Sequence, residues 1–166
     1  MKKLALFLAF FLLFITGCTE QSYDILSYQE KNLEALCVIN EKYTARLVKS
    51  GDKRSLVILE PRELCGIEIY YDNEGAFLVS GDMKIPVERE SLEGICAMLS
   101  VFSLEEEWLC KASGKEQAVL EFRTGELYYL LTLGKNQMPK EVSIQGNGFS
   151  YKIVVKEIKA SPQQTP

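Results

Sequence analysis

Apolar and polar residues alternate with a period of two along most of this chain, and that pattern restricts its fold more than any other feature. Apolar residues occupy every second position in the segments 43–47, 67–71, 118–122 and 149–155. This period predicts β-strands that bury one face and expose the other. Short turn sequences separate the segments, so successive strands are expected to pair as antiparallel hairpins.

The alternation and the turn residues together predict about eight strands. The expected strands are Cys37–Lys49, Arg54–Leu59, Ile67–Tyr71, Ala76–Ser80, Ala118–Arg123, Leu127–Leu133, Glu141–Gln145 and Phe149–Ile158. The strand Leu127–Leu133 is apolar on both faces. It is therefore either a central strand that is covered twice or a strand that lines a pocket.

Two segments show the spacing of amphipathic helices instead. Apolar residues fall on one helical face over residues 22–35, which predicts an N-terminal helix. Between Glu88 and Phe102, apolar residues recur at steps of three and four, which predicts a second helix inserted between strands. An apolar sheet face cannot be left bare, so both helices are expected on the concave face of one strongly curved antiparallel sheet. The expected fold class is α+β, with the sheet forming a half-barrel.

The inserted helix and the doubly apolar strand supply the residues of a candidate apolar cavity. These are Leu92, Ile95, Leu99, Phe102, Tyr129 and Leu131. Helix stripes of this kind more often form an ordinary core face than a gate over a ligand. A buried central strand explains Tyr129 and Leu131 equally well.

The N-terminus carries an export signal. Lys2 and Lys3 precede the uninterrupted apolar run Leu4–Ile15, which is about half the length of a bilayer-spanning helix. The sequence Ile15-Thr16-Gly17-Cys18 resembles the lipobox of bacterial lipoproteins. That resemblance implies removal of residues 1–17 and a lipid, including palmitate-type acyl chains, on Cys18. An ordinary signal peptide or an uncleaved anchor are the alternatives.

Lipidation at Cys18 sets the expected organisation and location of the chain. Residues 18–21 are a short tether, residues 22–159 are one domain, and residues 160–166 are a disordered tail. The protein is expected on the extracytoplasmic face of the cell membrane, or on an outer membrane in a host that has one. The lipid would hold it there.

Charge and composition exclude several classes of function. The 149 residues after position 17 have 17 Lys and Arg against 23 Asp and Glu, a net charge of −6. A protein with this negative net charge is not expected to bind nucleic acid or to adhere electrostatically to anionic lipids. The chain contains no histidine, the commonest general base and metal ligand. It has no metal-ligand spacing, phosphate loop or nucleophile elbow either, so we expect neither an enzyme nor a cofactor.

Four cysteines remain after Cys18: Cys37, Cys65, Cys96 and Cys110. In an exported protein they would form two disulfides with three possible pairings. They would equally serve as buried thiols that act as small hydrophobic side chains. Both possibilities stay open from the sequence.

The order of elements over 22–159 resembles the lipoprotein-carrier family of LolA and LolB. The resemblance lies in the N-terminal helix, the long strand Cys37–Lys49, the run Ile58–Ile67 that breaks at a proline, and Met138-Pro139-Lys140 before a late strand. It implies an apolar cavity that holds acyl chains. The cavity arginine of the carriers has no clear counterpart, because Arg46, Arg54 and Arg62 are better explained as solvated strand or turn residues.

A second branch of the same fold, the GerS-like germination lipoproteins of spore-forming bacteria, is similar as well. There the domain binds and activates a cell-wall amidase of the spore cortex. The sequence therefore favours a non-catalytic binding module whose partner is an acyl chain, another hydrophobic ligand or a protein of the cell envelope. An adhesin-like or purely structural surface domain is the remaining alternative.

Overall fold

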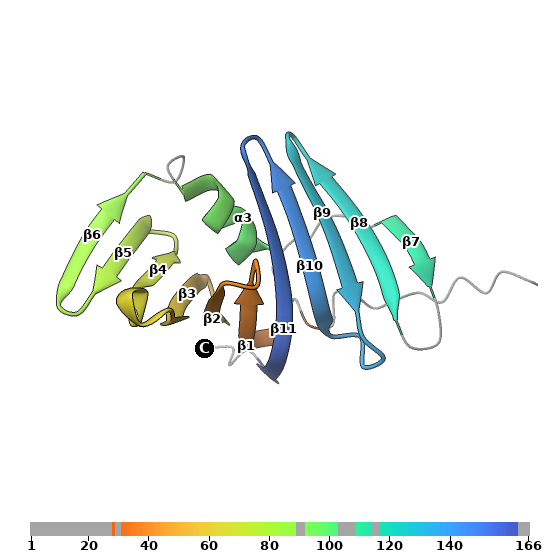
Figure 1. Ribbon diagram of the computed structural model, residues 1–166, viewed down its shortest axis with the longest axis horizontal. Coiled ribbons are helices and arrows are strands. Elements are labelled where there is room, and N and C mark those ends of the chain that lie inside the picture. The colour runs from red at the N-terminus through yellow and green to blue at the C-terminus, as the bar shows by residue number, and fades with distance from the viewer. Residues whose placement is uncertain (1–27, 29–30, 89–91, 103–108, 114–116, 163–166) are drawn as a thin grey trace, which may run out of the picture.

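The computed structural model describes residues 28, 31–88, 92–102, 109–113 and 117–162, and for residues 109–113 and Pro162 it describes the backbone alone. The predicted export signal, Cys18, the predicted tether and most of the predicted N-terminal helix lie outside the described residues. Figure 1 shows the molecule with its strands and helix labelled.

The eleven strands in the described part of the chain belong to one antiparallel sheet. The strands are β1 (Lys31–Ile39), β2 (Tyr43–Ser50), β3 (Lys53–Glu60), β4 (Glu68–Tyr71), β5 (Ala76–Ser80), β6 (Met83–Val87), β7 (Leu109–Ser113), β8 (Ala118–Thr124), β9 (Leu127–Leu133), β10 (Pro139–Gly146) and β11 (Phe149–Pro162). Their order is β6-β5-β4-β3-β2-β1-β11-β10-β9-β8-β7, so the sheet is open and β6 and β7 form its edges. A short 3₁₀ turn, η1 (Arg62–Leu64), joins β3 to β4.

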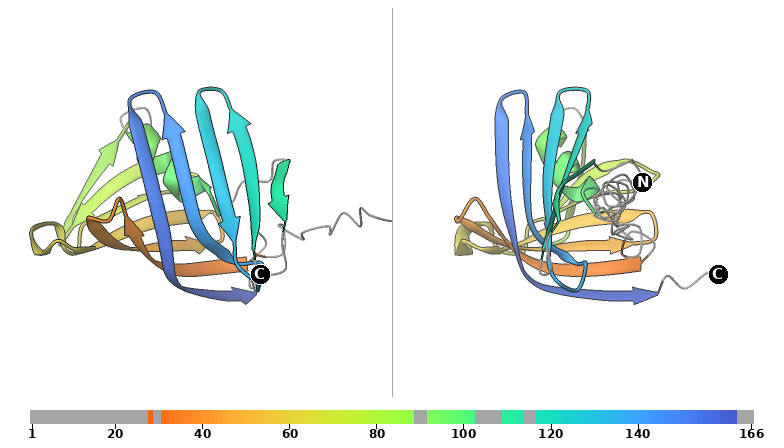
Figure 2. Two further views of the ribbon diagram at one scale, coloured as in Figure 1. Left: turned by 45° about the vertical axis from the view of Figure 1, so that its right-hand side comes forward. Right: turned by 90° about the vertical axis from the view of Figure 1, so that its right-hand side faces the viewer.

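The sheet curves around a single described helix, α3 (Glu93–Ser100). One arm of the sheet runs from β6 to β1 and the other from β11 to β7, and the two arms face each other across α3 (Figures 1 and 2). The long strand β11 joins them, because it pairs with β10 through Phe149–Val154 and with β1 through Ile153–Pro162. The curved antiparallel sheet with an inserted helix is therefore confirmed, and it has the shape of a half-barrel.

The predicted number of strands is wrong, first because the long strand Cys37–Lys49 is two strands. The chain turns between Ile39 and Tyr43, where Asn40 and Glu41 have φ values of 50° and 57°. Positive φ at both central residues is the requirement of the tight hairpin turn, which usually contains Asn-Gly. Asn40 also accepts a hydrogen bond from the Lys152 amide and donates one to the Ser150 carbonyl, so its side chain ties this turn to β11.

The other two additional strands are β6 and β7. Met83, Ile85 and Val87 alternate with Lys84 and Pro86 in β6. Proline is tolerated in this strand because β6 is an edge of the sheet and pairs with β5 alone. Strand β7 falls in a segment whose conformation the sequence leaves undefined, and it pairs with β8.

The predicted N-terminal helix over 22–35 is wrong from Lys31 onward, because Lys31–Ile39 forms β1. Leu33, Ala35, Cys37 and Ile39 are buried at every second position, which is a strand period. Residue Tyr28 is fully buried against the same core. At the other end, β11 extends through residues 160–162, which pair with β1, so the predicted tail begins at least three residues too early.

The core fills the concave side of the sheet. Side chains that are at most 3 % exposed come from both arms, from α3 and from the two residues that follow it. They are Leu33, Ala35, Cys37, Ile39, Ala45, Leu47, Met98, Leu99, Val101, Phe102, Ala118, Leu120, Tyr129, Leu131, Leu133, Val142, Ile144 and Ile153. These residues form a single contiguous cluster. Because the strands alternate, the polar partners of these residues lie on the convex face.

Candidate functional site

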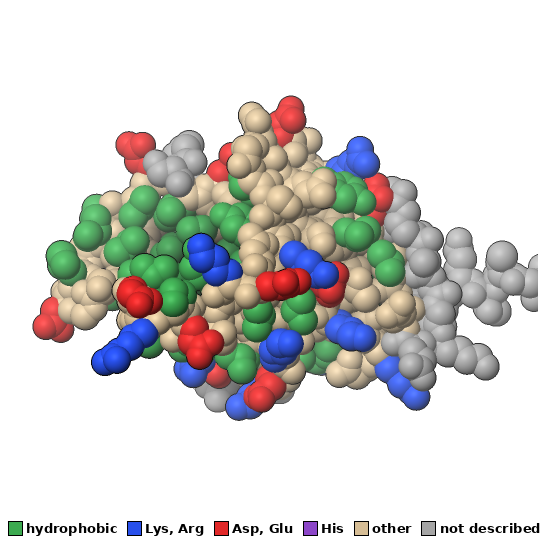
Figure 3. All heavy atoms as spheres, viewed as in Figure 1, with side chains coloured by type: hydrophobic (Ala, Val, Ile, Leu, Met, Phe, Trp, Pro, Cys, Tyr) green, Lys and Arg blue, Asp and Glu red, His purple; other side chains and the backbone are tan. Residues whose placement is uncertain are grey.

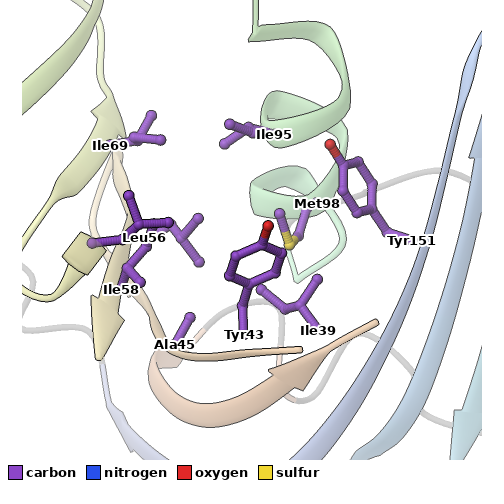
Figure 4. A pocket seen from close by; sticks show the side chains of 10 residues that line it. Ile39, Tyr43, Ala45, Leu56, Ile58, Ile69, Ile95, Met98 and Tyr151 are labelled. Atoms are coloured by element: carbon purple, nitrogen blue, oxygen red, sulfur yellow. The ribbon is translucent and has the colours of Figure 1, made fainter. Parts of the chain in front are cut away.

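An apolar pocket of about 200 Å³ lies between α3 and the arm made of β2, β3 and β4 (Figure 4). Its lining residues are Ile39, Tyr43, Ala45, Leu56, Ile58, Leu64, Ile69, Ile95, Met98 and Tyr151. Every lining side chain is hydrophobic apart from the hydroxyl groups of the two tyrosines. The pocket is therefore suited to an apolar group, and none of the described residues that line it is charged.

The register of β2, β3 and β4 brings the strand residues that line the pocket together. Ala45 on β2 faces Ile58 on β3, and Leu56 on β3 faces Ile69 on β4. Side chains at paired positions lie on the same face of a sheet, so these residues form adjacent rows on the concave side. Leu64 reaches the same space from η1.

Helix α3 covers the pocket with Ile95 and Met98. Its position is fixed by a polar contact as well as by packing. The Tyr71 hydroxyl lies 3.0 Å from Ser100 Oγ, and Ser100 Oγ donates to the Cys96 carbonyl at 2.8 Å, so Tyr71 is the donor to Ser100. Strand β4 thereby holds the last turn of the helix.

The first turn of α3 approaches β11 closely at Gly94. A Cβ atom at this position would lie 2.7 Å from a ring carbon of Tyr151 and 3.2 Å from Phe149. Contacts this short force the helix or the rings to move. The absence of a side chain at Gly94 thus sets the distance between the helix and Tyr151, a residue that lines the pocket.

We expect Gly94→Ala to destabilise the protein by about 1–3 kcal/mol, because the cost of overpacking exceeds the modest gain in helix propensity. The matched control is Gly134→Ala, where the nearest atoms lie at 3.4 and 3.8 Å and little change is expected. Urea unfolding followed by circular dichroism measures both. Equal midpoints for the two variants would show that α3 does not pack on β11 as described.

The sequence-predicted cavity residues lie in two different places. Ile95 lines the pocket. Leu99, Phe102, Tyr129 and Leu131 are at most 3 % exposed and belong to the core cluster, and Leu92 is half-buried. For these four residues, the structure agrees with the second interpretation given above, in which the apolar face of the helix and the strand β9 form part of the core.

Most of the pocket was missed because its walls come from strands β2, β3 and β4. Tyr43, Ala45, Leu56, Ile58 and Ile69 look like ordinary inward-facing strand residues in the sequence. No pattern in the sequence separates these five residues from the other inward-facing strand residues.

One arginine is placed differently from the sequence expectation. Arg54 pairs in register with Lys49 and Tyr71, two residues before the pocket residue Leu56 on the same concave face. Partial burial lowers the pKa of its guanidinium, and the nearby Tyr71 and Asp52 oppose that shift. Arg46 and Arg62 are exposed, as expected.

Two titratable groups of the core remain neutral near physiological pH. Burial raises the pKa of Tyr129 to about 12, with smaller contributions from Tyr71 and Glu93. Burial also raises the pKa of Cys37 to about 12, so its thiol does not ionise and is a poor nucleophile. Cys37 and Cys65 are free thiols, which accords with the buried-thiol alternative for Cys37.

Apolar side chains extend from the pocket towards the edge of the sheet. Ile69, Leu78 and Ile85 are paired across β4, β5 and β6, and Ile85 and Met83 are 44 % and 62 % exposed. Figure 3 shows hydrophobic side chains gathered over this arm. The pocket therefore opens beside an exposed apolar surface.

The described part of the chain lacks two kinds of feature. No helix there is long and apolar enough to cross a bilayer. Among the same residues, no three histidine, cysteine, aspartate or glutamate side chains come together as metal ligands would.

No protein-family model matches this chain, and no curated protein matches it. Among solved structures it is similar to an uncharacterized conserved protein from Thermus thermophilus, with 12 % identity, a TM-score of 0.54 and coverage of 84 % of this chain and 85 % of that one. A LolA superfamily protein, NE2245 from Nitrosomonas europaea, is 11 % identical with a TM-score of 0.40 over 89 % and 92 %.

The structure of the CwlD amidase from Clostridioides difficile in complex with the GerS lipoprotein contains a chain that is 14 % identical, with a TM-score of 0.45 over 91 % and 97 %. At these identities a likeness concerns the fold alone. The Thermus thermophilus protein, whose TM-score exceeds 0.5, has the same overall fold as this chain. The sheet curved around a concave-face helix is the architecture expected from the LolA-like resemblance.

Proposed function

We propose that this chain is a membrane-anchored, extracytoplasmic lipoprotein that acts as a non-catalytic binding module. The pocket under α3 would bind an apolar ligand, such as an acyl chain. The observation that carries the proposal is the pocket itself, whose ten lining residues are all hydrophobic or tyrosine. Removing an apolar ligand from water stabilises such a complex by about 25 cal/mol for each Å² buried.

The anchor supports the same proposal. A lipid on Cys18 would hold the pocket close to the membrane, and the acyl chains of such an anchor contribute about 0.8 kcal/mol for each buried CH₂ group. A pocket that receives apolar molecules benefits from that location, because such molecules are concentrated in and near the bilayer.

Filling the pocket tests the proposal. We expect Ile95→Trp to abolish ligand binding, because the indole occupies space that the ligand requires while α3 keeps its place. The mature protein, purified without detergent, would be examined by native mass spectrometry for a bound apolar molecule. The matched control is Val79→Trp on the convex face of β5, which should keep the ligand. An unliganded mass for the wild-type protein would contradict the proposal.

The second candidate is a regulatory partner of a cell-wall amidase, as in the GerS-like lipoproteins. The specific observation that favours it is the exposure of Met83 and Ile85 beside the pocket, since exposed apolar surface of this kind commonly marks a protein interface. Recovery of an amidase with the tagged wild-type protein, and its loss with Ile85→Asp, would support this candidate.

A further inference from the structure

Two tyrosine hydroxyl groups are the polar side-chain groups among the described residues that line the pocket. Tyr43 on β2 and Tyr151 on β11 both line it, and their hydroxyl oxygens point towards the side covered by α3 (Figure 4). Tyr151 lies against the first turn of the helix, since its hydroxyl is 3.1 Å from where a Cβ of Gly94 would be. The two residues come from β2 in one arm and from β11, the strand that joins the arms.

Neither hydroxyl hydrogen-bonds to another described residue. The contacts of these side chains are made by their rings, with Lys42 over Tyr43 at 5.2 Å and Phe149 beside Tyr151 at 5.6 Å. By contrast, the Tyr71 and Tyr128 hydroxyls, which also lie on strands of this sheet, contact Ser100 and Glu121. The two pocket hydroxyls are thus available to a ligand.

The pocket is small. Its volume of about 200 Å³ is somewhat larger than the roughly 150 Å³ of an apolar cavity that takes benzene. It is smaller than the roughly 300–1,000 Å³ of sites that bury drug-sized ligands. One aromatic ring with a short chain fits these limits, whereas several long acyl chains exceed them.

We propose that the pocket is a binding site for small amphipathic carboxylic acids, with the apolar body between α3 and β2–β4 and the carboxylate oxygens hydrogen-bonded to Tyr43 and Tyr151. A phenol is a strong donor, and a hydrogen bond to an ionised acceptor is about twice as strong as a neutral one. Met98, which lines the same pocket, adds a sulfur contact that favours an aromatic ring. This inference rests on the proposed function and specifies the class of ligand.

The three methionines that follow the export signal provide reporters for the test. Met98 lines the pocket, Met83 is exposed on the edge strand β6, and Met138 packs against the core outside the pocket lining. The chain from Thr19 onward contains all described strands and α3, so it is used in soluble form with ¹³C-labelled methionine methyl groups. The probe is 3-phenylpropanoate, and 3-phenylpropylammonium is the matched compound without an acceptor oxygen.

We expect 3-phenylpropanoate to shift the Met98 methyl resonance saturably, with little change at Met138, and to bind at least tenfold more tightly than the ammonium compound. The double variant Tyr43→Phe/Tyr151→Phe keeps both rings and removes both hydroxyls, so it should weaken binding of the carboxylate by about tenfold or more. Tyr70→Phe, on the convex face of β4, is the matched control and should bind as the wild type does. The two single variants show whether each hydroxyl contributes.

The other outcomes separate this inference from the proposed function. Unchanged carboxylate affinity in the double variant, or tighter binding of the ammonium compound, overturns the role of the hydroxyls while the pocket remains a binding site. A Met98 shift with palmitate but not with 3-phenylpropanoate overturns the small-ligand inference and supports an acyl-chain site. A Met98 resonance that no apolar probe shifts overturns both.

Discussion

Replacing Cys18 with alanine is expected to move the protein from the membrane fraction to the soluble fraction or to leave it as an uncut precursor. The thiol of Cys18 is the group that a lipid would acylate at the end of the Ile15–Cys18 sequence. Alanine has no nucleophile, so neither the thioether to the lipid nor the cleavage that depends on it can form. Metabolic labelling with a palmitate analogue should fall to background.

The control for this variant is Cys65→Ala. Cys65 is an exposed free thiol after η1, so this change removes a cysteine without touching the proposed anchor. The amount of palmitate analogue that this variant incorporates, and the share of it in the membrane fraction, should equal those of the wild type. Labelling that persists in Cys18→Ala would show that the anchor lies elsewhere, and the proposed location at the membrane would then lose its basis.

The sequence predicts the type of fold well because one signal, the period-two alternation, is repeated in many segments. The pairing of β8 with β9 and of β10 with β11 follows from two short turns, and the observed registers agree with them. The inserted helix was also recognisable, since its apolar residues recur at steps of three and four while the flanking segments alternate.

The errors have local physical causes. Asn40-Glu41 forms a hairpin turn without the glycine that usually marks it, because the Asn40 side chain is held by β11, a strand more than a hundred residues away. Such a long-range hydrogen bond is invisible to a local pattern. For residues 31–35, a helical and a strand period overlap, and pairing with β2 and β11 selects the strand.

The pocket was harder to predict than the fold because it depends on which inward-facing residues the helix leaves uncovered. Ile69 on β4 and Leu131 on β9 have the same character in the sequence, and both face the concave side. Leu131 is fully buried in the core, whereas Ile69 lines the pocket beside α3. The difference between core and pocket residues therefore depends on tertiary packing around α3, which a local sequence pattern does not contain.

The complete burial of Leu131 predicts the largest effect of a single substitution on stability. We expect Leu131→Ala to destabilise the protein by about 2–5 kcal/mol, because the side chain is 0 % exposed and its removal leaves a cavity among residues of β8, β9 and β10. A protein of this kind has a total stability of about 5–15 kcal/mol, so the variant should unfold at a much lower urea concentration.

Leu130→Ala is the matched control, because it makes the same chemical change one residue away. Leu130 lies on the opposite face of β9 and is only half-buried, so a loss of about 0.5 kcal/mol is expected. Urea unfolding of both variants and of the wild type measures the difference in the free energy of unfolding. The dependence of that free energy on urea concentration is compared with the wild-type value. Equal losses would mean that β9 is covered on both faces, as its sequence alone allows, and would contradict a convex face that is only half-buried at Leu130.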